Sequence, residues 1–290
     1  MGWTGFTLFI LTLFRFNFQR SLHKNYASKK KNHNLDTTKA SAALTKILKV
    51  SKVFSSSLNV SLLFQLAVME LKNIVGNNYL RSSANESKFE KTLLDNDNQA
   101  YVWYRKGGLI LFRLQDLIGE NNLNEGFKVY MTAAKFRETP FTTTIEWYDY
   151  MKEVPPDSLQ YYVEDSFEKI TLYSNKVTAA TYKKLEDNKY EVTITVESAK
   201  NYFDGNGKLL EEGSKANALD IGIFDNDIKN TQGMMVKSAL ILQKEWVQPG
   251  TSSFSYITNK VPVKAGIDPY NKMIDRIPDD NLISLEEIFD

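Results

Sequence analysis

The pattern of hydrophobic positions changes once along the chain, from helical spacing to strict alternation. Between residues 104 and 166, apolar residues recur at intervals of three and four, which predicts a series of helices. From about Phe167 the apolar residues alternate with polar ones, and turn residues separate short β-rich segments. Strands at this density are typical of an antiparallel sandwich. We therefore expect an α+β fold, with an array of helices followed by an antiparallel β-sandwich.

Local signals place the ends of the expected helices. One helix is predicted to begin near Tyr104 and to end at Gly119, because glycine suits a helix C-cap. Asn122 with Glu125 has the spacing of a capping box and predicts the start of a second helix. The apolar face of this second helix would consist of Leu123, Phe127, Tyr130, Met131 and Ala134.

Two more helices are expected before the strands begin. Thr143 and Glu146 repeat the capping-box spacing ahead of an aromatic pair. A proline pair then precedes the segment 157–167, which predicts one further short helix. Within the β-rich part, the stretch "DGNGK" at Asp204 faintly resembles a calcium loop, but Lys208 occupies a ligand position. The stretch is therefore predicted to be a hairpin turn.

The first residues of the chain point to a membrane. Residues 3–14 form an apolar run that Arg15 closes. A helix of this length covers roughly 18 Å of a hydrocarbon core of about 30 Å, so it is short for a full span. Positive charge follows this run, and no small-residue cleavage site appears, which disfavours a signal peptide. A buried core helix is the alternative, but the lysine-rich flank favours the end of a transmembrane helix.

Charge divides the chain into a basic head and an acidic body. Residues 1–52 contain ten lysines and arginines and one acid, Asp36, whereas residues 53–290 contain 26 basic and 34 acidic residues. Next to an apolar helix, this basic segment is expected to contact anionic membrane lipid and not nucleic acid, because lysines and arginines without a folded frame give only weak, nonspecific attraction to phosphate. The stretch 57–80 has one apolar face, which suits a core helix and a membrane-surface helix equally.

Some kinds of site are excluded by composition. The chain has no cysteine, which excludes disulfides and cysteine-ligated metals. Its only two histidines, His23 and His33, lie ten residues apart in the basic head. They cannot share a helix face in the way that metal ligands four residues apart do.

Several motifs occur in an order that resembles a known family. These are "QAYVWYRKGGLILFRLQDLIGENNLNEGFKVYM", "EVPPDSLQYYVEDSFEKITLYSNKV", "ALDIGIF" and "KAGIDPYNKMIDRIPDDNLI". Together they resemble the zinc aminopeptidases of the aminopeptidase N family, most closely the bacterial members that are fused to an ABC-transporter-type permease. The resemblance covers roughly residues 86–290, and the preceding residues resemble the edges of that permease.

This resemblance implies an organisation and a location for the chain. It divides the sequence into a membrane-anchoring helix at 1–20 and a basic linker with an amphipathic helix at 21–85. The helical part of a peptidase-like catalytic domain follows at 86–166, and a β-sandwich domain at 167–290. The chain would lie at the bacterial inner membrane, with its body on the cytoplasmic face because of the basic flank.

One catalytic residue is implied by the same resemblance. In this family, the tyrosine of a Tyr-x-Lys-Gly motif donates a hydrogen bond to the oxyanion of the tetrahedral intermediate, and Tyr104 occupies that position. Such a donor stabilises charge that appears only in the transition state. Lys106, in the same motif, is expected to be a solvated cation at the start of the helix.

The family's metal site is missing from the sequence. Its zinc ligands come from an H-E-x-x-H motif and a further glutamate, and this chain contains no such motif. We therefore expect no zinc to be bound by this chain alone. An internal deletion between residues 80 and 90, either natural or an error of the gene model, would explain the loss.

Three functional hypotheses remain open from the sequence. The chain could be a truncated, membrane-associated relative of the aminopeptidases without independent activity. It could instead be a half-enzyme that acts on a peptide substrate once a separate zinc-bearing chain completes its site. The third hypothesis is a membrane-anchored module whose sandwich binds a partner protein.

Overall fold

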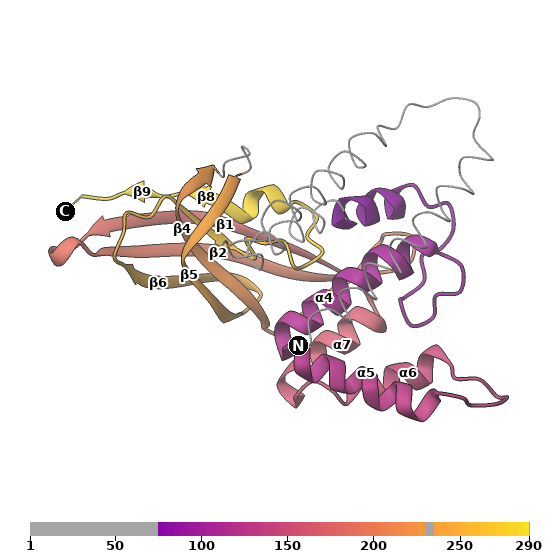
Figure 1. Ribbon diagram of the computed structural model, residues 1–290. Coiled ribbons are helices and arrows are strands. Elements are labelled where there is room, and N and C mark those ends of the chain that lie inside the picture. Colours follow the sequence, from indigo (N-terminus) through magenta and orange to yellow (C-terminus); the bar gives the residue numbers. More distant parts are fainter. Residues whose placement is uncertain (1–74, 230–234, 290) are drawn as a thin grey trace. The chain divides into compact units, whose positions relative to one another are not determined.

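The computed structural model describes residues 75–229 and 235–289, which all belong to one compact unit, Ser61–Asp290. The predicted membrane helix, most of the linker and both histidines lie outside these residues. Among the described helices, none is long and apolar enough to cross a membrane. The predicted α+β class is confirmed: helices come first, and two sheets of mainly antiparallel strands follow (Figure 1).

The helical part begins with helical residues 75–84, and a loop leads from there to a single π-helical turn. This turn runs directly into the first long helix, and three more helices follow. The elements are η1 (Val102–Lys106), α4 (Gly107–Ile118), α5 (Glu120–Ala134), α6 (Thr144–Lys152) and α7 (Asp157–Phe167).

Three of the four predicted helix signals are confirmed, and one of them is the proline pair, since α7 begins at Asp157 directly after it. Gly119 ends α4 with a φ of 85°, a conformation that favours glycine. Thr143 caps α6 by accepting a hydrogen bond from the backbone N–H of Glu146. The capping box at Asn122 was wrong, because α5 already begins at Glu120, immediately after Gly119. Asn122 therefore lies inside the helix, where its amide donates to the carbonyl of Ile118 at 2.7 Å.

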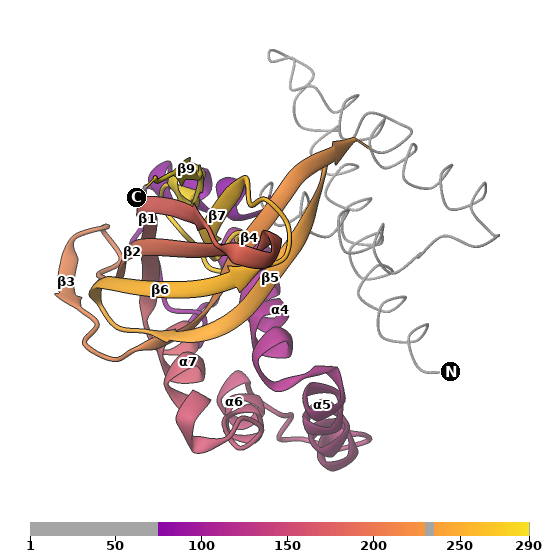
Figure 2. The ribbon, with the colours of Figure 1, turned by 90° about the vertical axis from the view of Figure 1, so that its left-hand side faces the viewer.

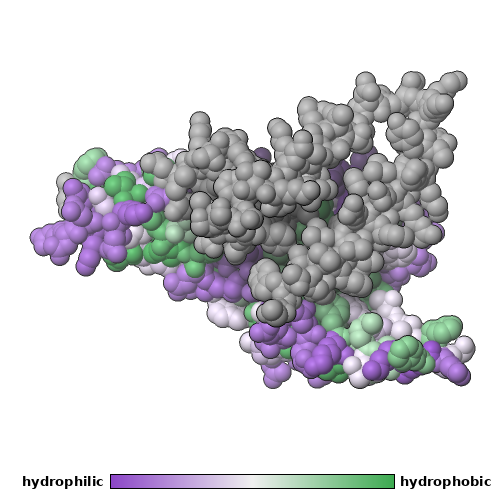
Figure 3. Space-filling model, in the orientation of Figure 1, coloured by the Kyte–Doolittle hydropathy of each residue, from purple (hydrophilic) through white to green (hydrophobic). Residues whose placement is uncertain are grey.

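The predicted apolar face of α5 is only partly buried. Leu123 is 2% exposed and Phe127 packs at the edge of the core, but Met131 is 59% exposed. Further exposed apolar residues follow in the α5–α6 connection, where Phe136 is 96% exposed. Hydrophobic side chains therefore lie among polar ones at the surface of this end of the helical part (Figure 3).

The strands form two sheets (Figure 2). One sheet has the order β3-β2-β1-β9, with β6 also paired to β2, and the other has the order β5-β4-β7-β8. All pairs are antiparallel except the short β1–β9 pair. The strands are β1 (Ile170–Lys184), β2 (Tyr190–Phe203), β3 (Leu209–Glu212), β4 (Asn217–Lys229), β5 (Met235–Val247), β6 (Gly250–Thr258), β7 (Lys264–Ile267), β8 (Leu282–Ser284) and β9 (Glu286–Glu287).

The predicted hairpin turn at Asp204 is confirmed. Its carboxylate accepts hydrogen bonds from the backbone N–H groups of Asn206 and Lys208, at 2.9 and 2.8 Å. These bonds close the turn between β2 and β3, which pair antiparallel. Two short 3₁₀ turns, η2 (Glu186–Asn188) and η3 (Pro278–Asn281), complete the described elements.

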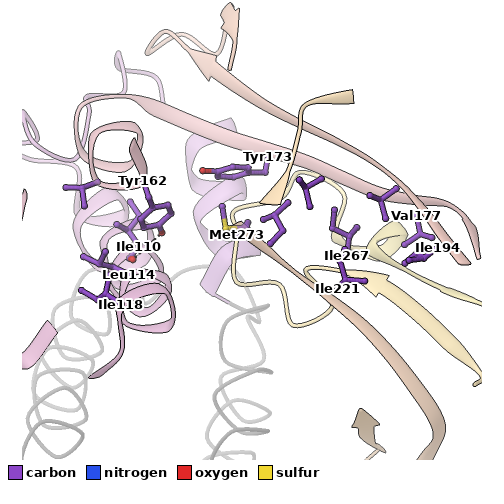
Figure 4. Close-up of a cluster of buried hydrophobic side chains, with 14 of the residues drawn as sticks. Ile110, Leu114, Ile118, Tyr162, Tyr173, Val177, Ile194, Ile221, Ile267 and Met273 are labelled. Atoms are coloured by element: carbon purple, nitrogen blue, oxygen red, sulfur yellow. Dashed lines mark hydrogen bonds between the residues drawn. The ribbon is translucent and has the colours of Figure 1, made fainter. Parts of the chain in front are cut away.

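One hydrophobic core joins the helices to the sandwich. Ile110, Leu114 and Ile118 of α4 lie in the same buried cluster as Tyr173 and the inward-facing residues of β2, β4 and β7 (Figure 4). The helix spacing of the α4 residues and the alternation in the strands explain why each element turns these side chains inward. The helical part and the sandwich therefore share their core, although they differ in sequence pattern.

Charged side chains fix α4 against the second sheet. Arg113 is 1% exposed, pairs with Asp116 and donates to the carbonyl of Ala218 in β4. Lys244 lies 2.8 Å from Asp116 and 2.7 Å from Asp220, so it bridges helix and sheet. Because several charges compensate one another here, their burial is tolerated. This network sets the direction of α4 and therefore the position of the turn at its N-terminus.

Candidate functional site

Tyr104 lies in the π-helical turn that precedes α4. In this turn the N–H of Gly107 donates to the carbonyl of Val102, a spacing of five residues. Such turns are rare and frequently occur at functional sites. The Tyr104 side chain is 50% exposed, and its ring meets the edge of Trp103 with 6.5 Å between centroids. Within the described ranges its hydroxyl makes no hydrogen bond, so it is free to donate to a ligand.

Arg105 ties the turn to the preceding helix. Its guanidinium donates to the carbonyl of Asn78 at 2.6 Å and to the hydroxyl of Ser82. Both acceptors lie in the helical residues 75–84. Trp103 is held as well, because its indole N–H donates to the carbonyl of Asn96 at 3.3 Å. The residues on either side of Tyr104 are therefore anchored to different segments, while Tyr104 itself points outward.

The prediction for Lys106 was wrong. This residue is only 1% exposed, and its Nζ lies 3.8 Å from Oε1 of Glu90 and 5.6 Å from the centre of the Tyr79 ring. Burial lowers the pKa of Lys106 to about 8, although the carboxylate of Glu90 acts in the opposite direction. Segments that contain Tyr79 and Glu90 cover the start of α4, and the local sequence of the motif gives no sign of this cover.

Glu90 is the centre of a buried polar cluster. Tyr79 and Ser83 each donate a hydroxyl hydrogen bond of 2.6 Å to its carboxylate, and Tyr101 donates a third of 3.1 Å. Burial raises the pKa of Tyr79 well above its usual value, and the charge of Glu90 adds to this effect. Burial and Glu90 also raise the pKa of Tyr101, so Tyr79 and Tyr101 both remain protonated donors at neutral pH. We call Tyr79, Ser83, Glu90, Tyr101 and Lys106 the Glu90 cluster.

Lys106 is incompletely satisfied within this cluster. Its Nζ has no hydrogen-bond partner in the described part of the chain, and 3.8 Å is too long for a hydrogen bond to Glu90. Three hydroxyl groups donate to the same carboxylate, one to Oε1 and two to Oε2. The sequence pattern does not reveal the cluster, because its members come from three separate segments and carry no recognisable spacing.

The residues around Tyr104 do not fit a zinc site. Among the described residues, no group of three or more histidine, aspartate or glutamate side chains could hold a metal ion. The nearest buried carboxylate, Glu90, already accepts three hydrogen bonds and faces a lysine. We therefore derive no step of a reaction through zinc from these residues.

Comparisons with known proteins identify no family. No protein-family model matches the chain, and no curated protein matches it at a significant level. The resemblance to the aminopeptidases therefore rests on the order of the motifs.

Proposed function

We propose that this chain is a membrane-associated, internally shortened relative of the zinc aminopeptidases that does not hydrolyse peptides by itself. The observation that best supports this proposal is the exposure and hydrogen bonding of the Tyr104 side chain. Its side chain is half exposed and its hydroxyl has no acceptor within the described residues, while its neighbours Trp103 and Arg105 are both hydrogen-bonded. A tyrosine held in this way is prepared to donate a hydrogen bond to a molecule outside the chain.

The chemistry explains why such a tyrosine is insufficient. A neutral phenol stabilises an oxyanion only after a nucleophile has attacked the peptide carbonyl. In the family, zinc and the glutamate of H-E-x-x-H supply the activated water, and the sequence lacks that motif. Tyr104 therefore keeps the hydrogen-bond donor that an oxyanion needs, but this chain alone supplies no activated water to form that oxyanion.

A hydrolysis assay tests the proposal. The purified full chain is incubated with the 7-amido-4-methylcoumarin derivative of leucine, with and without added zinc, beside a Tyr104→Phe variant. We expect no release of the fluorophore above the blank in any sample. Zinc-stimulated release that falls about 100-fold or more in Tyr104→Phe, the usual loss for an oxyanion donor, would contradict the proposal.

A half-enzyme is the second candidate, and the exposure of two adjacent aromatic residues favours it. Trp103 and Tyr104 are 41% and 50% exposed, which would suit a surface that a separate zinc-bearing chain covers. Mixing the chain with a polypeptide that carries an H-E-x-x-H half-domain distinguishes this candidate. Hydrolysis that needs both chains and is lost in Tyr104→Phe would establish it.

The membrane part of the proposal rests on sequence alone. Residues 1–52 carry ten basic residues next to an apolar run, which supports contact with anionic lipid at the bacterial inner membrane and a body on the cytoplasmic side. Flotation with phosphatidylglycerol vesicles, compared with phosphatidylcholine vesicles, tests the lipid contact. We expect more of the chain to float with phosphatidylglycerol vesicles than with phosphatidylcholine vesicles, and flotation that persists at high salt would show that the apolar run inserts.

A further inference from the structure

A cleft of about 720 Å³ has Glu90 in its wall, and Tyr104 does not line it. Its walls come from residues 89–95, from residues 168–170 at the start of β1, and from the β2–β3 hairpin. Phe89 and Leu210 line it and are 58% and 62% exposed. The cleft therefore offers apolar surface that nothing in the described part of the chain covers.

The positive charges of the cleft are already compensated. Two lysines line it. Lys91 pairs with Asp97 at 2.9 Å, and Lys169 pairs with Asp165 at 3.3 Å. Lys169 also lies over the ring of Tyr202, with Nζ 4.0 Å from its centre. Neither lysine is therefore available to neutralise other carboxylates in the cleft.

The negative charges are only partly compensated. Five carboxylates line the cleft, and two of them are engaged: Glu90 in its cluster, and Glu168 with Lys152 at 3.8 Å. The other three, Asp95, Asp204 and Glu211, form no ion pair with any described residue. Uncompensated carboxylates beside exposed apolar side chains favour a ligand that is both cationic and apolar.

The cleft also borders the end of a sheet. β3 is the last strand in its sheet order, and all four of its residues are exposed (Figure 2). Its second edge therefore has backbone groups that no described strand pairs. An extended peptide can add to such an edge through main-chain hydrogen bonds, and pockets for its side chains then give specificity.

A main-chain hydrogen bond holds the hairpin wall of the cleft against the wall formed by residues 89–95. The N–H of Glu90 donates to the carbonyl of Gly205 at 2.8 Å. A Cβ atom at Gly205 would lie 2.3 Å from the carbonyl oxygen of Glu90, so only glycine permits this approach. A preformed wall reduces the ordering cost of binding.

We propose that this cleft binds an extended, basic segment of a partner protein, with lysine or arginine side chains toward Asp95, Asp204 and Glu211. An apolar side chain of the same segment lies between Phe89 and Leu210. Phosphate-bearing ligands do not fit, because the free charges of the cleft are negative. This inference concerns a surface separate from Tyr104, so it does not depend on the proposed function.

Fluorescence anisotropy tests the proposal with the full chain. The probe is a fluorescein-labelled peptide of sequence Lys-Leu-Lys-Val-Lys-Leu-Lys, and the comparison peptide has glutamate in place of lysine. We expect the basic peptide to bind and the acidic one not to bind. The double variant Asp95→Lys/Glu211→Lys should weaken binding about tenfold or more, since it replaces two attractive contacts by repulsive ones.

A matched variant separates the cleft from net charge. Glu186→Lys/Glu286→Lys makes the same charge change at two exposed residues, Glu186 after the end of β1 and Glu286 beside Thr181. Thr181 and Glu186 lie roughly 36 Å or more along β1 from Ile170 in the cleft wall. This double variant should leave the affinity unchanged, and Leu210→Ser should weaken binding in the cleft without a charge change. Thermal unfolding checks that each variant is folded. Absence of binding, or an equal loss in both double variants, would overturn the proposal.

Discussion

Lys106 and Lys200 are both enclosed lysines that face a buried carboxylate, but their surroundings differ. Lys200 lies 2.6 Å from Oδ2 of Asp165, and the hydroxyl of Tyr202 donates to the other oxygen at 2.8 Å. Lys106 lies 3.8 Å from Glu90, and its Nζ has no hydrogen bond among the described residues. The lysine of one pair therefore donates a hydrogen bond to its carboxylate, whereas the lysine of the other pair does not.

The positions of the two lysines explain this difference. Lys200 and Asp165 join β2 to α7, where the helical part meets the sandwich and where a complete pair holds the two together. Lys106 lies two residues from Tyr104, in the turn that we assign to the candidate site. Incomplete polar interactions are more often found near functional sites than in the structural core. The comparison therefore separates a hydrogen-bonded structural ion pair from an ion pair whose lysine lacks a hydrogen bond.

The largest effect is expected from breaking the complete pair. Lys200→Met leaves the carboxylate of Asp165 buried without its closest cation, which typically costs about 3–5 kcal/mol of unfolding free energy. Urea denaturation of the full chain measures this loss. Lys169→Met provides the control, because Lys169 is 41% exposed and its pair with Asp165 should contribute less than about 1 kcal/mol. Equal losses in the two variants would show that Lys200 is not the main partner.

A pH-dependent effect is expected from Lys106. Folding lowers its pKa from 10.5 to about 8, so the folded state disfavours the charged form. Between these two pH values the unfolded chain binds more protons, and stability therefore rises with pH, by an amount on the order of 3 kcal/mol at most. Below pH 8 the full penalty is present.

The contribution of Lys106 is isolated by subtraction. Unfolding free energies of the natural chain and of Lys106→Met are measured from pH 7 to pH 10.5, since other groups, including the tyrosines of the Glu90 cluster, also titrate at high pH. The natural chain should gain stability relative to Lys106→Met as pH rises from about 8 to 10.5. A constant difference would show that Lys106 has an ordinary pKa in the folded protein.

A smaller effect is expected from Ser83. Ser83→Ala removes one of the three hydroxyl donors to Glu90, which should cost about 1 kcal/mol. It also leaves Oε2 of Glu90 with Tyr101 as its remaining hydroxyl donor, so the negative charge that faces Lys106 is less compensated and the pH window of Lys106 should move upward toward its ordinary value. Ser87→Ala, at an exposed position in the loop that follows the helix of Ser83, is the control. An unchanged pH window in Ser83→Ala would mean that the hydroxyl does not compete with Lys106.

Local patterns predicted most of the fold. Gly119 ends α4 and Thr143 caps α6 as expected, and the change to alternation near Phe167 coincides with the first strand. These signals depend only on residues that are close in sequence. Asn122 shows the limit, because a capping box cannot reveal that Gly119 allows the next helix to begin one residue later.

The candidate site was less predictable. Tyr104 was identified by its motif, and the structure places it at the surface of a π-helical turn. The burial of Lys106 could not be predicted, since the residues that cover it, Tyr79 and Glu90, lie 27 and 16 positions earlier in the sequence. The partial exposure of α5 was missed for a similar reason, because helical periodicity does not show which element covers a face.

The central claim is that the chain carries Tyr104 but has no zinc site. Titration of the full chain with zinc tests this claim most directly. Calorimetry of the natural chain and of His23→Ala/His33→Ala is the measurement, because these are the only histidines. We predict no stoichiometric, high-affinity zinc binding by either protein. High-affinity binding of one zinc ion by the natural chain would contradict this prediction, and its loss or persistence in the variant would show whether the histidines or the carboxylates hold the metal.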